Sequence, residues 1–218
     1  MVIAIALCGG KSSRMGRDKA LLELNGESLL AKTCRTALTV SDSMFIVARS
    51  QKQFQEAIAS LTISPESTRT ISQSPQLVID QKFDGALVGF WQGMEAIANS
   101  LTYQPDWILL LACDLPNLQD EILQTWVSQL RDLPSRAIAY LPRSVDQHSQ
   151  KQWEPLCGFY RWQCRDSLKE FIKNGGRSFQ KWLANQEVME IENAPRSMLV
   201  NCNTPEEFAA IAKRSNPN

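Results

Sequence analysis

A glycine- and cation-rich stretch near the N-terminus, LCGGKSSRMGRDKALLELNG over residues 7–26, carries the residue types that bind phosphate groups. Gly9 and Gly10 directly follow an apolar run, and glycines let backbone N–H groups approach an anion closely. The next residues supply four cations: Lys11, Arg14, Arg17 and Lys19. We expect this loop to bind a polyphosphate at the carboxyl end of the strand that ends at Leu7. A solvated basic turn is the alternative.

The spacing of this loop sets it apart from two common nucleotide-binding motifs. It is neither G-x-G-x-x-G nor G-x-x-x-x-G-K-[ST], because its glycines and lysines stand at other positions. The glycine pair alone would favour the solvated turn, whereas the whole string through Lys19 favours phosphate binding.

Asp114 is the second candidate centre, because it closely follows the apolar run WILLLA of residues 107–112. A carboxylate at the carboxyl end of a central strand lies where open α/β sheets bind ligands. Oxygen ligands of this kind suit Mg²⁺, which also keeps several waters. A turn or helix cap ahead of Pro116 is the alternative, and the C-D-L-P string does not decide between them.

Three further polar residues stand at strand or helix ends. Asp80 follows the short run LVI in the same way as Asp114 follows WILLLA, with a capping role as its alternative. Asn201 and Asn203 flank Cys202 ahead of a final helix and could contact the metal or the phosphates. Local capping explains both asparagines equally well.

The chain has one histidine, His148, and six scattered cysteines without a C-x-x-C pair. This composition excludes a zinc knuckle and most Ser-His or Cys-His nucleophile schemes. The cysteines fit reduced thiols in a cytoplasmic protein. Chemistry here must therefore depend on carboxylates, cations and backbone groups.

Composition excludes two other classes of protein. The 218 residues include 23 basic and 23 acidic side chains, so the formal net charge is zero. A balanced charge argues against a nucleic-acid binder. No apolar run approaches the roughly 18 residues of a membrane span. The N-terminal apolar run is also too short for a secretory signal, so we expect a cytoplasmic protein with no membrane partner.

Short apolar runs alternate with amphipathic segments through the first half of the chain. Runs at residues 2–7, 44–48, 77–79 and 107–112 predict strands buried on both faces. Apolar stripes at helical spacing run through residues 30–38, 87–101 and 118–130. This alternation predicts an α/β fold with a doubly wound, mostly parallel sheet and helices on both faces.

The second half is less regular. We expect strands at 137–141, 156–160, 188–191 and 198–200, and helices at 165–173 and 179–183. Thr204-Pro205-Glu206-Glu207 combines a capping box with proline at the first helical position, which announces a last helix. Residues 62–76 and the polar stretch 142–155 are expected to be loops. With no repeat or linker, residues 1–218 are expected to form one domain, with a nucleotide-binding half (1–135) and an acceptor-binding half (136–218).

The opening loop resembles the signature loop of the nucleoside-triphosphate transferase superfamily, and within it most closely the molybdenum cofactor guanylyltransferases. The resemblance covers nearly the whole chain and continues through VID, GALVG, ACDLP, EPL and NCNTPE. Cytidylyl relatives typically read L-A-A-G where this chain has L-C-G-G. The family implies a Rossmann-like fold.

The resemblance also implies roles for individual residues. In the family, the residues at the positions of this chain given next contact GTP: Leu7, Cys8, Gly9, Gly10, Lys11, Arg14, Lys19, Asp80 and Asp114. The residue matching Asp114 is the magnesium ligand, and Arg14 and Lys19 join it as catalytic residues. One departure concerns the Asn that family members often carry after the second strand, where this chain reads Ile46-Val47-Ala48-Arg49. No residue is assigned to that contact.

The implied reaction is GMP transfer from GTP to the phosphate of molybdopterin. A phosphate monoester is already largely a dianion at pH 7 and needs no general base, which fits the histidine-poor composition. Implied partners are GTP, molybdopterin, cofactor-delivery proteins and recipient molybdoenzymes. We expect the acceptor to dock at residues 142–160, where Trp153 offers a flat ring. The alternatives are a cytidylyl or sugar-phosphate nucleotidyltransferase and a catalytically silent nucleotide-binding regulator.

Overall fold

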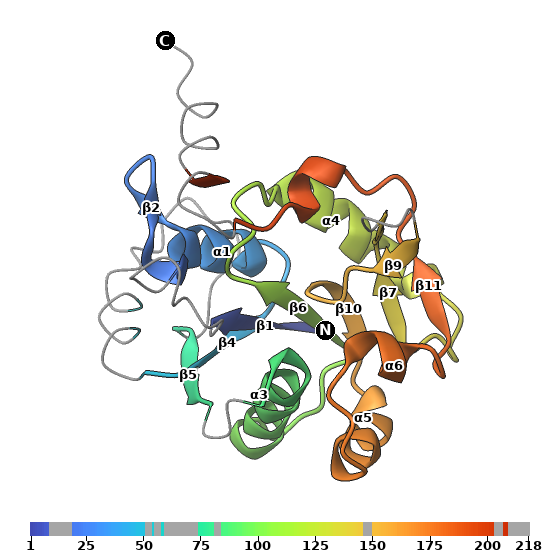
Figure 1. Cartoon of the computed structure of the whole chain (residues 1–218). Helices are drawn as coiled ribbons and strands as arrows, with labels where there is room; N and C mark the ends of the chain where they lie inside the picture. The colour runs from blue at the N-terminus through green and yellow to red at the C-terminus, as the bar shows by residue number, and fades with distance from the viewer. Residues whose placement is uncertain are drawn as a thin grey trace.

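A central β-sheet with helices on both faces forms the body of the protein (Figure 1). The computed structural model describes residues 1–8, 19–50, 54, 58, 74–80, 84–145, 150–202, 207 and 208. Within these residues, seven strands hydrogen-bond in the order β11-β7-β10-β6-β1-β4-β5. Strand β10 runs antiparallel to both of its neighbours, and the other neighbouring strands pair in parallel. The predicted fold class is confirmed.

The strands of the main sheet are β1 (Val2–Cys8), β4 (Ser43–Ala48), β5 (Gln76–Ile79), β6 (Trp107–Ala112), β7 (Ala139–Leu141), β10 (Cys157–Arg161) and β11 (Val188–Glu190). Two hairpins stand apart from it: β2 (Glu23–Leu24) with β3 (Glu27–Ser28), and β8 (Arg143–Val145) with β9 (Lys151–Trp153). The helices are α1 (Leu29–Leu38), α3 (Ala86–Ser100), α4 (Asp120–Gln129), α5 (Cys164–Lys173) and α6 (Phe179–Leu183). Short 3₁₀ turns are η2 (Lys19–Leu21), η3 (Leu130–Asp132) and η4 (Arg196–Leu199).

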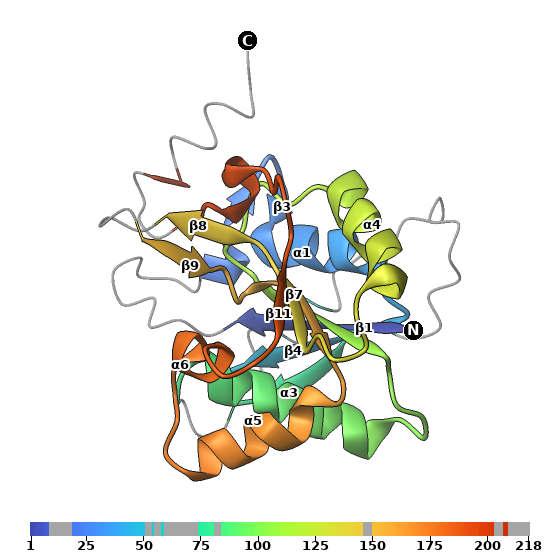
Figure 2. The same ribbon diagram turned by 90° about the vertical axis from the view of Figure 1, so that its right-hand side faces the viewer.

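Strand β1 lies between β4 and β6 and is covered on both faces. Because side chains alternate along a strand, Ala4 and Ala6 enter one core and Ile3 and Ile5 enter the other. The first core packs against α1 and α4, and the second against α3, α5 and α6. Figure 2 shows these two layers above and below the sheet. This two-sided burial explains why the central strands read as continuous apolar runs.

The order of the strands reverses at β1. After β1 the chain passes through α1 to β4 on one side, whereas β6 returns to the other side of β1. The carboxyl ends of β1 and β6 therefore form the switch point of the sheet, where doubly wound folds bind ligands. Residues that follow these two strands are the ones most directly placed to meet a ligand.

Three expectations from the sequence are wrong. Strand β5 is half-buried rather than buried on both faces, because it is the last strand on its side of the described sheet. Residues 198–200 belong to the 3₁₀ turn η4 and its cap, since Met198 N–H bonds to the Pro195 carbonyl and Met198 enters the core. Leu118 is buried but precedes helix α4, which begins at Asp120.

The polar stretch 142–155 is a further correction, because it contains the β8–β9 hairpin rather than only a loop. Arg143 pairs with Trp153 and Val145 with Lys151 across its two strands. Each strand has only three residues and a single apolar side chain, Val145 in one and Trp153 in the other, so no apolar alternation could announce these strands.

Two expected segments fall largely outside the described residues: the loop at 62–76 and the start of the last helix at 204–206. Of that loop, residues 74–76 are described, and Gln76 belongs to β5 instead. In the part of the chain that the structure describes, no helix combines the length and the apolar character that crossing a bilayer requires.

Candidate active site

Lys19 and Asp114 meet at the switch point of the sheet. Lys19 Nζ lies 3.9 Å from Asp114 Oδ2, and the two side chains are 18% and 23% exposed. Asp114 follows β6 by two residues, and Lys19 begins η2 on the chain that returns from β1. Two sequence motifs 95 positions apart thus place a cation and a carboxylate together at the carboxyl edge.

Burial dominates the electrostatics of Asp114. Removal from solvent raises the pKa of its carboxyl above the ordinary value, and the attraction of Lys19 opposes that rise without cancelling it. An additional cation beside such a buried carboxylate stabilises its ionised form. The site therefore favours the arrival of a positive charge next to Asp114.

The chain around Asp114 is fixed to β1 and to α1. Cys113 donates a backbone hydrogen bond to the Leu7 carbonyl (3.3 Å), and its Sγ donates a second to the same oxygen (3.0 Å). On the other side, Lys32 Nζ of α1 donates to the Pro116 carbonyl at 2.5 Å. Burial lowers the pKa of the Lys32 ammonium group, and the nearby Glu27 carboxylate opposes this. Asp114 is thus held between two anchored residues.

Helix α1 can provide its anchor because its start is well defined. Asn25 and Gly26 both have positive φ, +57° and +81°, as a tight two-residue hairpin turn requires. The Ser28 hydroxyl then accepts a hydrogen bond from Ala31 N–H and caps the helix. The turn and cap together set where Lys32 lies.

The segment after η4 also reaches the Asp114 loop. Cys202 N–H donates to the Asp114 carbonyl oxygen at 3.0 Å, and Asn117 Nδ2 donates to the Ser197 carbonyl. Burial raises the pKa of the Cys202 thiol, as does the Glu207 carboxylate. Asn201, a predicted site residue, is exposed next to this contact. Asn203 lies outside the described residues.

Asp80 lies at the same edge of the sheet but on another strand. It follows β5, its backbone N–H bonds to the Ala48 carbonyl, and it is only 9% exposed. Its Oδ1 accepts a 2.7 Å hydrogen bond from Gln92 Nε2 of helix α3. Sequence reasoning missed Gln92, although its place on the polar side of an amphipathic helix that follows Asp80 was a usable signal.

Strand spacing gives the layout of the site along this edge. Neighbouring strands lie about 4.8 Å apart, so β5 and β6, three steps apart, are separated by roughly 14 Å. Strand β7, which leads into the β8–β9 hairpin, lies two steps, or about 10 Å, on the other side of β6. Asp114 therefore stands between Asp80 and the hairpin.

The predicted site residues divide into two groups. Leu7, Cys8, Lys19 and Asp114 gather at the ends of β1 and β6, and Asp80 directly follows β5. Gly9, Gly10, Lys11 and Arg14 lie outside the described residues, as does His148 in the second half.

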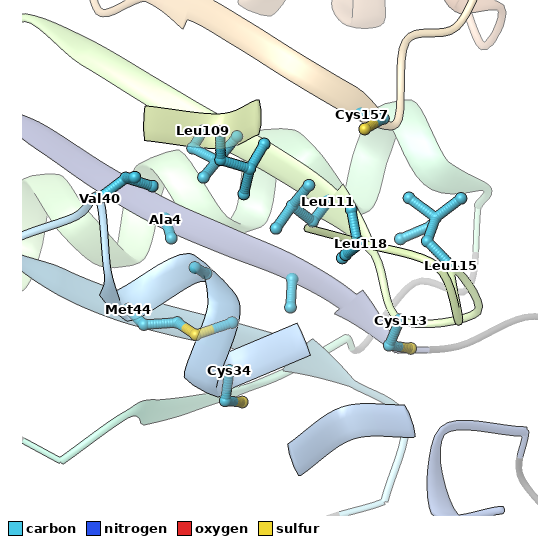
Figure 3. Packing of buried hydrophobic residues seen from close by; sticks show 14 of the residues in the cluster. Ala4, Cys34, Val40, Met44, Leu109, Leu111, Cys113, Leu115, Leu118 and Cys157 are labelled. Atoms are coloured by element: carbon cyan, nitrogen blue, oxygen red, sulfur yellow. The ribbon is translucent and has the colours of Figure 1, made fainter. Parts of the chain in front are cut away.

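Buried cysteine thiols pack in the core next to the switch point. All six cysteines are buried free thiols, and Cys34 and Cys113 belong to the same packed layer (Figure 3). Burial raises the pKa of Cys34 and, less strongly, proximity to Cys113 does so too. Cys34 stays a neutral thiol at neutral pH and acts as small core packing.

A divalent metal would have few protein ligands here. The described residues contain no group of three or more His, Cys, Asp or Glu side chains that could hold a metal. One partly buried carboxylate fits a cation that takes its remaining ligands from phosphates and water, as Mg²⁺ does. With Lys19 beside it, Asp114 can hold a metal-bound phosphate chain at the switch point.

Fold and site together define a nucleotidyltransferase. The model of the MobA-like NTP transferase domain matches residues 4–189, and the chain belongs to this family. A family of this kind typically uses a divalent metal.

Its relatives are guanylyltransferases by name. A probable molybdenum cofactor guanylyltransferase from Nostoc sp. is 41% identical over 209 residues, covering 95% of this chain and 89% of the relative. Its counterpart from Synechococcus elongatus is 39% identical, covering 95% and 96%. Among solved structures, the molybdopterin-guanine dinucleotide biosynthesis protein A from Archaeoglobus fulgidus has a TM-score of 0.67 at 19% identity, covering 99% of this chain and 98% of that one. That likeness shows the shared fold.

Proposed function

We propose that this protein transfers GMP from GTP to the terminal phosphate of molybdenum-bound molybdopterin in the cytoplasm. A phosphate oxygen of the acceptor forms a bond to the α-phosphorus of GTP while the bond between the α-phosphorus and the bridging oxygen breaks. The products are the guanine dinucleotide cofactor and pyrophosphate. The names of the relatives support this reaction, and cofactor-delivery proteins and recipient molybdoenzymes are its proposed partners.

The position of the Lys19–Asp114 pair is the observation that carries the proposal. With the base at Asp80, just after β5, a nucleotide laid across β4 and β1 brings its phosphates to Lys19 and Asp114. The separation of roughly 14 Å suits an extended nucleotide. The acceptor then approaches from the second half of the chain, which gives residues 1–135 and 136–218 their proposed roles.

Each residue has a defined task in this arrangement. Lys19 neutralises charge on the triphosphate, and Asp114 is the proposed ligand of Mg²⁺. Bound there, Mg²⁺ would stabilise negative charge that develops on the leaving pyrophosphate. Arg14 and the backbone of residues 9–11 are proposed triphosphate contacts on the strength of the sequence, and Asn201 and Asn203 are further candidate polar contacts.

Positioning and charge neutralisation account for the expected catalysis. Nucleophile and GTP are both anions, so the site must bring them together before bond formation. Transfers at phosphorus are catalysed mainly by such positioning and electrostatic stabilisation. The acceptor is a dianion at neutral pH, so no side chain has to remove a proton from it.

The deciding experiment is incubation of the purified protein with molybdopterin, Mg²⁺ and each of GTP, CTP and ATP. We expect pyrophosphate and a guanylated pterin with GTP, and at most traces with the other nucleotides. Lys19→Ala should raise the KM for GTP and lower kcat, because it removes a cation from the phosphates. Preference for CTP, or no pyrophosphate with any nucleotide, would contradict the proposal.

A further inference from the structure

The β8–β9 hairpin lies at the same edge of the sheet as Asp114. Strand β8 begins two residues after β7, and Glu154 N–H bonds to the Pro142 carbonyl at the base of the hairpin. The Leu156 carbonyl, just beyond, accepts a 2.8 Å hydrogen bond from Ala112 at the end of β6. Figure 2 shows β8 and β9 projecting on the side to which β1 points. The hairpin thus borders the site without belonging to its nucleotide half.

A planar cation is built into this hairpin. Arg143 and Trp153 are directly opposite each other in the two strands, and the Arg143 guanidinium carbon lies 3.8 Å from the centre of the Trp153 ring. Arg143 Nε also pairs with Glu190 Oε2 of β11 at 3.4 Å. A guanidinium held by a ring face and a carboxylate has a fixed plane, which an isolated surface arginine lacks.

The backbone of Trp153 is held by helix α6. Gln180 of α6 accepts from the Trp153 N–H through Oε1 (3.4 Å) and donates from Nε2 to the Trp153 carbonyl (2.7 Å). The ring also packs against the core under α3 and α6. These contacts hold Trp153 in place beneath Arg143. Because Arg143 already lies over the Trp153 ring, we no longer expect the flat acceptor to stack directly on Trp153.

We propose that Arg143, stacked on Trp153 and oriented by Glu190, is the platform on which the flat bicyclic ring of the acceptor stacks. One face of the guanidinium meets Trp153, and the Arg143 side chain remains 34% exposed. Guanidinium groups stack on flat aromatic rings, and a ring–arginine–ring sandwich gives both contacts to one cation. This inference rests on the proposed function, since it specifies how that acceptor is held.

The position of this platform suits the reaction geometry. It lies about two strand spacings, or roughly 10 Å, from β6. A ring stacked on Arg143 can then extend its phosphate toward Asp114, while the nucleotide approaches from the opposite side. Arg143 becomes a determinant of acceptor binding and stays clear of GTP.

The chain contains a matched control for this arginine. Arg136 pairs with Glu187 at 2.6 Å near the starts of β7 and β11, whereas Arg143 pairs with Glu190 near the ends of the same two strands. Both are Arg–Glu pairs between the chain segments around β7 and β11, but the Arg136 pair precedes these strands and so stands at the opposite edge of the sheet. Arg136→Met therefore tests loss of such a pair away from the site.

The test compares wild type, Arg143→Met, Arg143→Lys and Arg136→Met. Two quantities are measured: KM values for molybdopterin and GTP, and binding of 6-hydroxymethylpterin phosphate by its fluorescence polarisation. We expect Arg143→Met to weaken both acceptor measures about tenfold with GTP KM unchanged. Arg143→Lys, which keeps the charge and the Glu190 pair, should weaken both acceptor measures several-fold. Arg136→Met should match wild type in all of these measurements.

The outcomes separate this inference from the proposed function. Unchanged acceptor KM and pterin binding in Arg143→Met would overturn the platform, even while guanylated pterin still forms. Wild-type behaviour of Arg143→Lys would also overturn it, because charge alone would then suffice. Equal weakening of GTP and acceptor would show general damage to the site and count against the platform. Absence of product from wild type itself would instead reject the proposed function.

Discussion

Lys32 Nζ lies 2.5 Å from the carbonyl oxygen of Pro116, which ties helix α1 to the loop that carries Asp114. The other side of that loop is anchored by Cys113, through its two hydrogen bonds to the Leu7 carbonyl. A functional side chain is most precisely placed when the backbone on both sides of it is fixed. Lys32 is therefore a positioning residue for Asp114, because it acts through the backbone of the loop that carries this carboxylate.

Lys32→Met should lower kcat and raise the Mg²⁺ concentration needed for half-maximal rate. The variant keeps the length of the side chain but removes the charged donor to Pro116, which loosens the Asp114 loop. We expect a stability loss of about 1–2 kcal/mol, since the hydrogen bond is charge-assisted and only partly buried. Urea unfolding gives the stability, and rates at graded Mg²⁺ give the metal response.

Arg35→Met is the control for this variant, because Arg35 pairs with Glu27 and Asp120 from the next turn of α1. Its pairs are more exposed, so its removal should cost at most about 1 kcal/mol. If Lys32→Met lost stability but kept the wild-type Mg²⁺ response, Lys32 would support the fold without positioning Asp114.

Gly158→Ala should destabilise the protein by about 1–3 kcal/mol, because a Cβ there meets packed neighbours. It would lie 2.6 Å from Leu141 Cδ2 and 2.8 Å from the Tyr140 carbonyl oxygen, between β10 and β7. The carbonyl belongs to the sheet and cannot move aside cheaply. Chemical denaturation of the variant measures the loss.

Gly89→Ala in helix α3 provides the contrast. Its Cβ would stand 3.5 Å from Leu7 Cδ2, an ordinary contact. Alanine also favours helix over glycine by up to about 1 kcal/mol. We expect unchanged or slightly higher stability, and a loss as large as that of Gly158→Ala would show that the α3–β1 layer is tighter than these distances indicate.

The sequence predicted the central elements well because burial on two faces leaves a plain pattern. Strand β6 matches its predicted bounds at Trp107 and Ala112, and helix α6 matches at Phe179 and Leu183. The edge strand β5 was predicted with too much burial, since a short apolar run does not reveal how many neighbours a strand has. Sheet order is a tertiary property that local periodicity does not contain.

The site was only partly predictable for a related reason. Asp114 and Lys19 belong to recognisable motifs that follow central strands, so the sequence predicted that they lie near each other. The structure gives the distance between them as 3.9 Å. Lys32 and Gln92 act through contacts between elements distant in sequence, and neither belongs to a motif. Arg143 stacks on Trp153 because of the register of the hairpin, which the short polar strands β8 and β9 do not announce.

Gln92→Leu and Asp80→Asn should both weaken the preference for GTP over ITP and ATP. In the proposed orientation, Asp80 accepts from the guanine N1–H and exocyclic amine, and Gln92 orients that carboxylate through its bond to Oδ1. Loss of a hydrogen bond to a charged group costs about 1.5–3 kcal/mol, so Asp80→Asn should reduce the preference at least about tenfold. Gln92→Leu should reduce it several-fold, measured as ratios of kcat/KM.

The control for the base contact is Glu95→Gln, one turn along α3, where Glu95 pairs with Arg165 rather than with Asp80. It should leave the nucleotide preference unchanged. Undiminished GTP preference in Asp80→Asn would exclude the base contact and leave Asp80 as a structural cap at the end of β5.

Asp114→Asn should remove most activity and yet raise the thermal stability of the ligand-free protein at pH 7. Loss of the proposed metal ligand should lower kcat by about 10²–10³ and abolish the response to Mg²⁺. The gain in Tm has a separate cause. Burial raises the pKa of Asp114 above its ordinary 3.8, so folding is less favourable with the carboxylate than with the neutral carboxyl. Asn is neutral at every pH.

The pH dependence follows from that direction. Because the native pKa lies above the unfolded one, the stability from this group is fully present below pH 3.8 and is lost as pH rises through the native pKa. The Tm advantage of Asp114→Asn over wild type should thus be largest at pH 7 and vanish toward pH 3.8. Melting in EDTA from pH 7 to pH 4 measures it, with Asp132→Asn as a surface control, since that side chain is 76% exposed. A lower Tm for Asp114→Asn at pH 7 would mean that the attraction of Lys19 outweighs burial.

Adding GTP and Mg²⁺ should reverse the order of the two Tm values. Ligand binding stabilises the wild-type protein, whereas the variant has lost the carboxylate that is proposed to hold the metal.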